Sequence, residues 1–330
     1  MKRLMLALPF LVAACESGVT APRRPMVPSV ANLSVNGTPA VSTNFENFTL
    51  GSVNGQQDWL SLGSVNRGCA VYDHAVVSNT YGYASFGLKS LRMSNAVTSG
   101  CFGDQTFSGR TPNPAGQTGA AYGGFSLGVL QNHFETEWSF ASTVPGTEQP
   151  GLSVVGSPDR GDGSRMSWVQ MTDTPGGLAV NFYEVRGATN PANFVKSPVA
   201  AGLSRAVPHT IRLTMDFVDG PGNDVVRVYV DGVLKVTGTS WENYYLYDSE
   251  QAPAGNRVPI VNRVLFRTGG PAAPLTNGKG FVIDNLQITT FTVATTKDGC
   301  KEGGWMSLRA GDGSSFSNQG DCIQFVNTGR

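Results

Sequence analysis

The chain has 330 residues, of which 24 are Lys or Arg and 24 are Asp or Glu, so its formal net charge at pH 7 is zero. A chain without a charge excess has no field that attracts nucleic acid or an acidic membrane surface, and we expect no nucleic-acid partner. Only 15% of residues are charged, 41 are glycine, and long apolar stripes at helical spacing are absent. This composition predicts an all-β protein with glycine-rich turns.

The amino terminus has the pattern of an export signal. Two basic residues precede the apolar run LMLALPFLVA, which ends in VAAC at Cys15 and is too short for a bilayer span of about 20 residues. Residues 1–15 resemble a bacterial lipoprotein signal with its lipobox. The resemblance implies lipidation of Cys15 and an exported protein held by lipid at the outer membrane or cell surface. An ordinary secretory signal with an incidental cysteine is the alternative.

Residues 16–43 are rich in Pro, Ser, Thr, Gly and Asn without sustained hydrophobic periodicity, which predicts a disordered tether. Residues 44–296 follow as one domain of a size that is ordinary for a single β-sandwich. About a dozen strands are expected, which suits two packed sheets better than a small barrel. Outside the central meander, they are expected at 45–50, 70–77, 88–93, 134–140, 151–155, 165–171, 178–185, 258–267 and 281–289.

The clearest pattern in the chain lies at residues 209–247. The run HTIRLTMDF alternates polar and apolar residues, DGPGND breaks it, and VVRVYV begins a second alternating run. Asp231-Gly232 then leads into a third run, and this dipeptide is a strong signal for a tight hairpin. We predict a three-strand antiparallel meander.

The pattern H-T-I-R-L-x-x-D-F-x-D-G … V-x-V-Y-V-D-G-x-L in this meander resembles the back sheet of concanavalin A-like (LamG-type) jelly-roll domains. The resemblance covers residues 44–296 and implies a two-sheet antiparallel jelly-roll β-sandwich. Lectins, laminin G-like modules, glycan lyases and glucanases share this scaffold, so the resemblance indicates fold rather than chemistry.

Residues 297–330 form a small, glycine-rich segment with two cysteines. Its pattern C-K-x-G-G-W … F-x-N-Q-G-x-C-x-x-F-V resembles a short carboxy-terminal motif of bacterial exported proteins. A segment this small needs a covalent link or a docking surface to hold a structure.

Four cysteines remain if Cys15 carries lipid, and an even number in an exported chain predicts disulfides. Three connectivities are open. We favour Cys69–Cys101 and Cys300–Cys322, because each closes a local loop and loop entropy predicts a stabilisation of about 3 to 4 kcal/mol for each. A zinc site is not expected, since CxxC spacings are missing and the three histidines are far apart in sequence.

Glu135 and Glu137 are the candidate catalytic pair. They stand two apart on the predicted strand FETEWSF, so both project from one face while the aromatic residues project from the other. Two carboxylates on one face are typical of glycosidases. However, the E-x-D-x-x-E pattern of jelly-roll glucanases is not met, and a solvated polar face is the alternative. Lyase motifs are not visible, and His209 beside Pro208 is interpreted as structural.

The tract TSWENYYLYD at 239–248 is the candidate ligand-binding region. Aromatic rings next to polar groups are typical of sugar-binding surfaces, because pyranose C–H faces stack on rings while hydroxyls need polar partners. A loop that covers the edge of the core is the alternative. The candidate residues are Trp241, Glu242, Asn243, Tyr244 and Tyr245.

A structural Ca²⁺ is the candidate cofactor. Related sandwiches bring their first and last strands together and bind calcium there through oxygen ligands, and here Glu46, Asp284 and Asn285 match that arrangement. Acidic turns compete as calcium sites, although their turn-forming roles explain them without metal. These turns contain Asp159, Asp162, Asp219, Asn223 and Asp224.

Three functions follow from these observations. The first is an exported lipoprotein whose jelly roll binds glycan without chemistry. The second is a structural or adhesive module without a small-molecule site. The third is a hydrolase or lyase acting on glycans, and the absence of a complete catalytic pattern argues against it.

Overall fold

The computed structural model describes residues 39–61, 72–98, 105–117, 130–250 and 260–329. Cys15, Cys69 and Cys101 lie outside these ranges, so the lipidation site and the first predicted disulfide remain predictions. Within the described part of the chain, no helix is long and apolar enough to cross a membrane.

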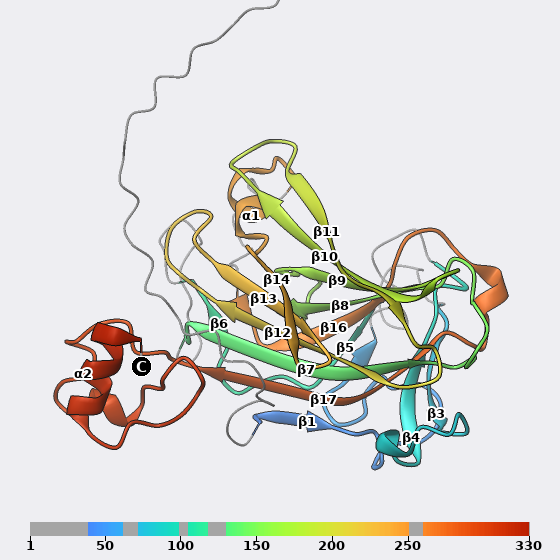
Figure 1. The fold of residues 1–330 in the computed structure, drawn as a ribbon, viewed down its shortest axis with the longest axis horizontal. Coiled ribbons are helices and arrows are strands. Elements are labelled where there is room, and N and C mark those ends of the chain that lie inside the picture. The colour runs from blue at the N-terminus through green and yellow to red at the C-terminus, as the bar shows by residue number, and fades with distance from the viewer. Residues whose placement is uncertain (1–38, 62–71, 99–104, 118–129, 251–259, 330) are drawn as a thin grey trace, which may run out of the picture.

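Two large antiparallel sheets face each other and form the sandwich (Figure 1). The first sheet has the order β14-β13-β12-β7-β17-β4-β3, with β1 also paired to β17. Its strands are β1 (Val41–Thr43), β3 (His74–Ser78), β4 (Lys89–Met93), β7 (His133–Ser142), β12 (His209–Asp216), β13 (Val225–Val230), β14 (Val233–Gly238) and β17 (Phe281–Phe291).

The second sheet has the order β11-β10-β9-β8-β16-β5-β2. Its strands are β2 (Leu60–Ser61), β5 (Gln105–Phe107), β8 (Ser153–Asp159), β9 (Trp168–Thr174), β10 (Gly177–Arg186), β11 (Asn193–Leu203) and β16 (Arg263–Thr268). A small third sheet pairs β6 (Ala115–Gly116) with β15 (Ile260–Val261). These sheets confirm the predicted two-sheet antiparallel jelly-roll sandwich.

The core fills the space between the two large sheets. On β7, the side chains of Phe134, Trp138 and Phe140 point inward and are fully buried, as the alternation of FETEWSF predicts. Gly156 on β8 lies directly against Trp138, because a Cβ there would be 2.7 Å from the indole Cζ2 atom. Glycine therefore lets the indole approach the backbone of the opposite sheet.

The predicted meander forms β12, β13 and β14, and its hairpin turns at Asp231 and Gly232, whose φ angles are 51° and 75°. One expected strand is wrong, and one long strand was not predicted. Residues 45–50 form a turn rather than a strand, with Phe45 and Phe48 buried in the core. The long strand β11 was not predicted, because its sequence does not alternate between apolar and polar residues.

The tract at 239–248 contains a short helix, α1 (Glu242–Tyr247), where a loop was expected. The helix lies beside β10 and β11 in Figure 1. Among the described connections, 3-10 helices occur at Ala84–Phe86, Pro274–Thr276 and Gly304–Met306.

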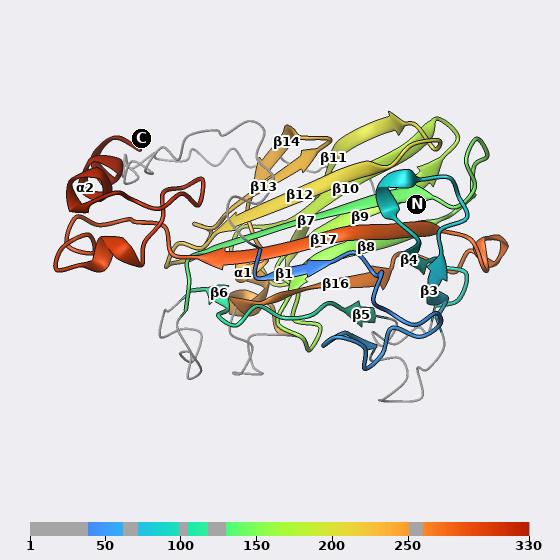
Figure 2. The same cartoon turned by 90° about the horizontal axis from the view of Figure 1, so that it is seen from below.

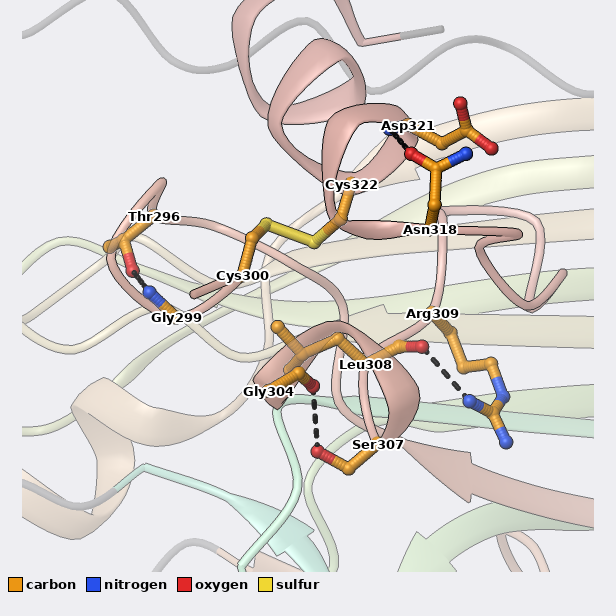
Figure 3. Close-up of a disulfide and its surroundings, with 10 residues drawn as sticks. All are labelled: Thr296, Gly299, Cys300, Gly304, Ser307, Leu308, Arg309, Asn318, Asp321 and Cys322. Atoms are coloured by element: carbon orange, nitrogen blue, oxygen red, sulfur yellow. Dashed lines mark hydrogen bonds between the residues drawn. A yellow bond between two sulfur atoms is a disulfide. The ribbon is translucent and has the colours of Figure 1, made fainter. Parts of the chain in front are cut away.

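The carboxy-terminal segment forms a small unit beyond the end of β17 (Figures 1 and 2). The predicted Cys300–Cys322 disulfide is confirmed, and it joins the start of the segment to α2 (Gln319–Thr328) near its end (Figure 3). The side chain of Asn318 caps this helix by accepting the backbone N–H of Asp321 at 3.0 Å. The unit has its own apolar cluster, which includes both cysteines and Phe316, Phe325 and Ala294.

Candidate functional site

The outer face of the second sheet carries aromatic and polar side chains that alternate with the core. On β9, Trp168 and Gln170 point outward and are half-buried, whereas Val169 and Met171 between them are fully buried. On β10, Asn181 and Tyr183 point outward in the same way. The sequence of each strand therefore sends one set of residues to the core and presents another on the surface.

Strand register brings these outward residues together. Trp168 pairs with Tyr183, and Tyr183 pairs with Lys196 of β11, so one row runs across three strands. Gln170 pairs with Asn181 in the adjacent row. We call this set the outer strip, together with two arginines that contact Trp168: its members are Arg165, Trp168, Gln170, Asn181, Tyr183, Lys196 and Arg267.

Hydrogen bonds fix the polar groups in the middle of the outer strip. The Tyr183 hydroxyl donates to Gln170 Oε1 at 3.1 Å, and Gln170 Nε2 donates to the Ser153 hydroxyl at 2.8 Å. The two rings of the strip, Trp168 and Tyr183, have centroids 6.1 Å apart. The strip is thus a pre-arranged surface on rigid strands.

The charged groups of the outer strip are all positive. The guanidinium carbons of Arg165 and Arg267 each lie 5.6 Å from the Trp168 ring centroid, and Lys196 Nζ lies 5.9 Å from that of Tyr183. Lys196 is exposed and forms no ion pair with any described residue. The strip therefore combines aromatic rings, amide groups and cations.

Two rings of the predicted ligand-binding tract pack against residues of this strip. Trp241 is only 5% exposed, stacks on Trp168 with centroids 5.9 Å apart, and donates its indole N–H to the Tyr183 carbonyl at 2.9 Å. Tyr245 is also buried and donates to the Arg165 carbonyl at 2.8 Å. Trp241 and Tyr245 are four residues apart, so α1 turns both rings to the same side.

The three remaining candidate residues of that tract differ in burial. Glu242 and Asn243 are buried, whereas Tyr244 is half-buried and lies 5.4 Å from exposed Phe194, measured between ring centroids. An open sugar-stacking surface formed by Trp241 and Tyr245 does not fit their burial. The alternative interpretation, in which these rings cover the core, matches their positions.

Glu135 and Glu137 lie on the outer face of the first sheet, as their spacing on β7 predicts. Glu135 forms an ion pair with Arg212 of β12, and its carboxylate oxygen lies 3.8 Å from His133 Nε2. Burial raises the pKa of Glu137, which forms no ion pair with a described residue and lies in register with Arg212. A neighbouring pair of carboxylates is therefore present, but Glu135 is engaged in ion pairs.

Further ion pairs lie on the same face. His133 Nδ1 lies 2.6 Å from Asp216 Oδ1, and Arg227 Nη1 donates to Asp216 Oδ2 at 2.6 Å. Burial would lower the pKa of His133, but hydrogen bonds and charges from Asp216 and Glu135 outweigh it and raise this pKa to about 9. We call these residues the ion cluster: His133, Glu135, Glu137, Arg212, Asp216 and Arg227.

The predicted calcium residues are close to one another. Glu46 accepts the backbone N–H groups of Leu88 and Lys89 at 2.6 and 3.1 Å, and Asp284 accepts the Ser90 hydroxyl at 2.7 Å. Burial, with the nearby Glu46 charge, raises the pKa of Asp284 to about 7. The side-chain amide of Asn285 donates instead to the Ser85 carbonyl at 3.0 Å. Calcium at this position stays a prediction.

His209 is buried between Asp231 Oδ2 at 2.8 Å and the Ser204 carbonyl at 2.9 Å, which matches its interpretation as structural. Among the residues that the structure describes, no three His, Cys, Asp or Glu side chains group as metal ligands.

Sequence reasoning did not identify Trp168 and Tyr183. Both stand at outward positions of predicted strands, at 165–171 and 178–185, and an aromatic residue at an outward position was the available signal. Their adjacency depends on the pairing of β9 with β10, which only the structure provides.

Comparison with known proteins finds this fold class at low similarity. An alginate lyase aligns with a TM-score of 0.43 and 11% identity, covering 78% of this chain and 99% of its own. An endo-β-1,4-glucuronan lyase from the fungus Trichoderma reesei gives 0.40 and 13%, covering 77% and 96%. A carbohydrate-binding module from Bacillus subtilis gives 0.33 and 10%, covering 72% and 98%. No family model and no curated protein sequence matches the chain. The jelly-roll assignment therefore depends on the strand order and register observed in this chain.

Proposed function

We propose that this protein is a glycan-binding jelly roll whose binding surface is the outer strip. The observation that carries the proposal is the row Trp168–Tyr183–Lys196, which places two rings and a cation side by side on adjacent strands. Sugar rings pack their C–H faces on aromatic rings, and their polar groups pair with amides such as Gln170 and Asn181.

The charge of the outer strip favours an acidic glycan. Arg165, Lys196 and Arg267 supply three positive charges, and the strip contains no carboxylate. A uronate-containing polysaccharide would place its carboxylates against these cations, with guanidinium groups suited to paired hydrogen bonds. A neutral glycan would leave Lys196, which forms no ion pair with a described residue, without a carboxylate partner.

The test is binding to a panel of neutral and uronate-rich polysaccharides, measured by calorimetry or affinity electrophoresis. We expect Trp168→Ala to weaken binding at least tenfold, whereas Tyr247→Ala, which removes an exposed ring outside the strip, leaves it unchanged. No binding to any polysaccharide, or equal binding by Trp168→Ala, would contradict the proposal. Lys196→Ala provides a second strip variant that removes only an exposed side chain.

Catalysis by the ion cluster is the competing function. It is motivated by the raised pKa of Glu137 beside the ion-paired Glu135. Assays for released reducing ends and for unsaturated products should be negative on every polysaccharide that binds. Product formation that is lost in both Glu135→Gln and Glu137→Gln would replace binding by hydrolysis as the function.

The export signal and Cys15 support attachment to the bacterial cell envelope through lipid. Metabolic labelling with a fatty-acid analogue should mark the wild type and not Cys15→Ala. An unlabelled wild type would contradict lipid anchoring while leaving the glycan proposal intact.

A further inference from the structure

An exposed aromatic side chain lies next to the outer strip at the edge of the second sheet. Phe194 is on β11, two positions before Lys196, and the pairing of β11 with β10 has no register shift between them. Their side chains therefore project from the same face of the sheet. Phe194 is 45% exposed, and β11 is the edge strand. The ring thus continues the surface of the outer strip to the border of the sheet.

Two rings hold Phe194 in place. Its centroid lies 4.9 Å from that of Trp241, which directly precedes α1, and 5.4 Å from that of Tyr244 within α1, both in edge-to-face arrangements. Trp241 also stacks on Trp168, so one buried ring contacts both Phe194 and a ring of the outer strip. Phe194 is therefore pre-arranged on a rigid strand.

Phe194 extends a surface that already contains two rings and a cation. Single exposed apolar residues are common on proteins and need no explanation. Phe194 instead adjoins Trp168 through Trp241 and stands beside the exposed Lys196. Such a combination suits a sugar, because the C–H face of a pyranose packs on the ring while its hydroxyls and carboxylate pair with polar groups nearby.

Three half-buried or exposed rings stand on successive strands. Trp168 is on β9, Tyr183 on β10 and Phe194 on β11, and these strands are neighbours in the sheet. Neighbouring strands are about 4.8 Å apart, which is close to the length of one sugar residue in an extended polysaccharide. Successive sugars of a chain that crosses the strands would therefore meet successive rings.

We propose, on the basis of the glycan binding proposed above, that the glycan crosses the strands obliquely from Trp168 over Tyr183 to Phe194. Phe194 is then a third stacking residue, at the edge of the site. Phe194 and Lys196 are about 7 Å apart along β11, so one sugar can stack on the ring while its carboxylate reaches the ammonium. About three consecutive sugars fill this path, because it spans two strand spacings and two residues of β11. A disaccharide does not reach from Trp168 to Phe194.

The alternative path for a glycan runs along β9. A chain on that path would follow Trp168, Gln170 and Thr172, whose side chains alternate with buried residues and point outward, and it would not reach Phe194. Thr172→Ala and Phe194→Ala therefore distinguish the two paths.

The test measures affinity as a function of ligand length. The probes are oligosaccharides of two to six sugars, cut from the polysaccharide of the panel that the wild type binds most tightly and measured in competition with it. We expect the wild-type affinity to rise steeply between two and four sugars. Phe194→Ala should weaken binding of the longer fragments roughly tenfold and leave binding of the disaccharide unchanged. Leu234→Ala, which removes an exposed apolar side chain from the edge strand of the other sheet, should bind like the wild type.

Two further substitutions separate stacking on the ligand from packing inside the protein. Phe194→Leu keeps apolar contact with Trp241 but has no ring, so it should bind the longer fragments as weakly as Phe194→Ala does. Phe194→Tyr keeps the ring and should bind them like the wild type. Recovery of binding in Phe194→Leu would show that Phe194 only supports Trp241, and would overturn the proposal.

Unchanged affinity of Phe194→Ala for every fragment would also overturn it, as would an equal loss for the disaccharide and the longer fragments, or a loss in Thr172→Ala instead. A wild type that binds no polysaccharide contradicts the proposed glycan binding itself, before any variant is compared. Weakened binding in Trp168→Ala with wild-type binding in Phe194→Ala leaves the proposed function in place and removes only the path to the edge at β11.

Discussion

The outer faces of the two sheets are both polar, but they balance charge differently. On the first sheet, the ion cluster pairs its groups internally, with Arg212 on Glu135 and with His133 and Arg227 on Asp216. On the second sheet, the outer strip places the exposed Lys196, which forms no ion pair with a described residue, beside the ring of Tyr183. Internal pairing contributes to stability, whereas an exposed cation beside an aromatic ring suits an external partner.

The outer strip should depend on the buried ring of Trp241, which packs against Trp168. Trp241→Ala should lower the free energy of unfolding by roughly 3 to 5 kcal/mol, because it leaves a cavity and removes the bond to the Tyr183 carbonyl. That corresponds to a melting temperature about 10 °C lower. Urea unfolding of Trp241→Ala and the exposed control Tyr247→Ala checks this, and equal stability would show that Trp241 is not a core residue.

Removing an arginine from the ion cluster should also lower the free energy of unfolding. Arg212→Ala leaves the Glu135 carboxylate buried beside His133 without its guanidinium partner, and we expect a loss of about 3 kcal/mol. The double variant Arg212→Ala/Glu135→Gln should recover part of that loss, because it removes the unpaired charge. Glycan binding should stay as in the wild type, and weakened binding would move the binding surface to the first sheet.

The contribution of the ion cluster to the free energy of unfolding should depend on pH. Burial opposes ionisation of Asp216, but hydrogen bonds and charges from His133 and Arg227 outweigh it and lower its pKa to about 2. This contribution is present above the unfolded pKa near 3.8 and is lost as pH falls through about 2. The raised pKa of His133 contributes fully below about 6.5 and is lost as pH rises through about 9.

The free energy of unfolding of the wild type should therefore exceed that of Asp216→Asn. The difference should be largest between about pH 4 and 6.5, where it should be on the order of 2 kcal/mol. Chemical unfolding of both proteins from pH 2 to pH 10 measures this difference. A difference that stays constant over the whole range would mean that His133 and Asp216 do not titrate as a pair.

The sequence predicted the first sheet better than the second. Strands β7 and β12 carry regular alternation, and a tight Asp-Gly turn sets the following hairpin, so local patterns sufficed for this part of the fold. Strand β11 was missed because it is an edge strand with exposed residues and Pro198, and edge strands need no apolar face.

The candidate site depended on contacts that local patterns do not encode. The aromatic content of the tract at 239–248 predicted a ligand-binding region, yet helical spacing turns Trp241 and Tyr245 toward the core. Asp224 was considered as a competing calcium residue and explained by its turn, but its contact with Gln117, which precedes it by 107 positions, could not be predicted. Register and chain crossing, rather than composition, assemble these groups.

The smallest change in stability with a measurable effect on binding is expected for Lys196→Ala. The ammonium is exposed and unpaired among the described residues, so its removal should alter the free energy of unfolding by less than about 0.5 kcal/mol. Binding to a uronate-rich polysaccharide should nevertheless weaken several-fold, since the lysine would contact a carboxylate on the partner.

The salt dependence of binding tests this contact further, because screening weakens attraction between exposed charges. Raising the salt concentration should therefore weaken wild-type binding more than that of Lys196→Ala, while Lys235→Ala, an exposed lysine on β14, behaves as wild type. Identical salt dependence in all three proteins would show that the cations of the outer strip do not contact the glycan, and the preference for acidic polysaccharides would have to be abandoned.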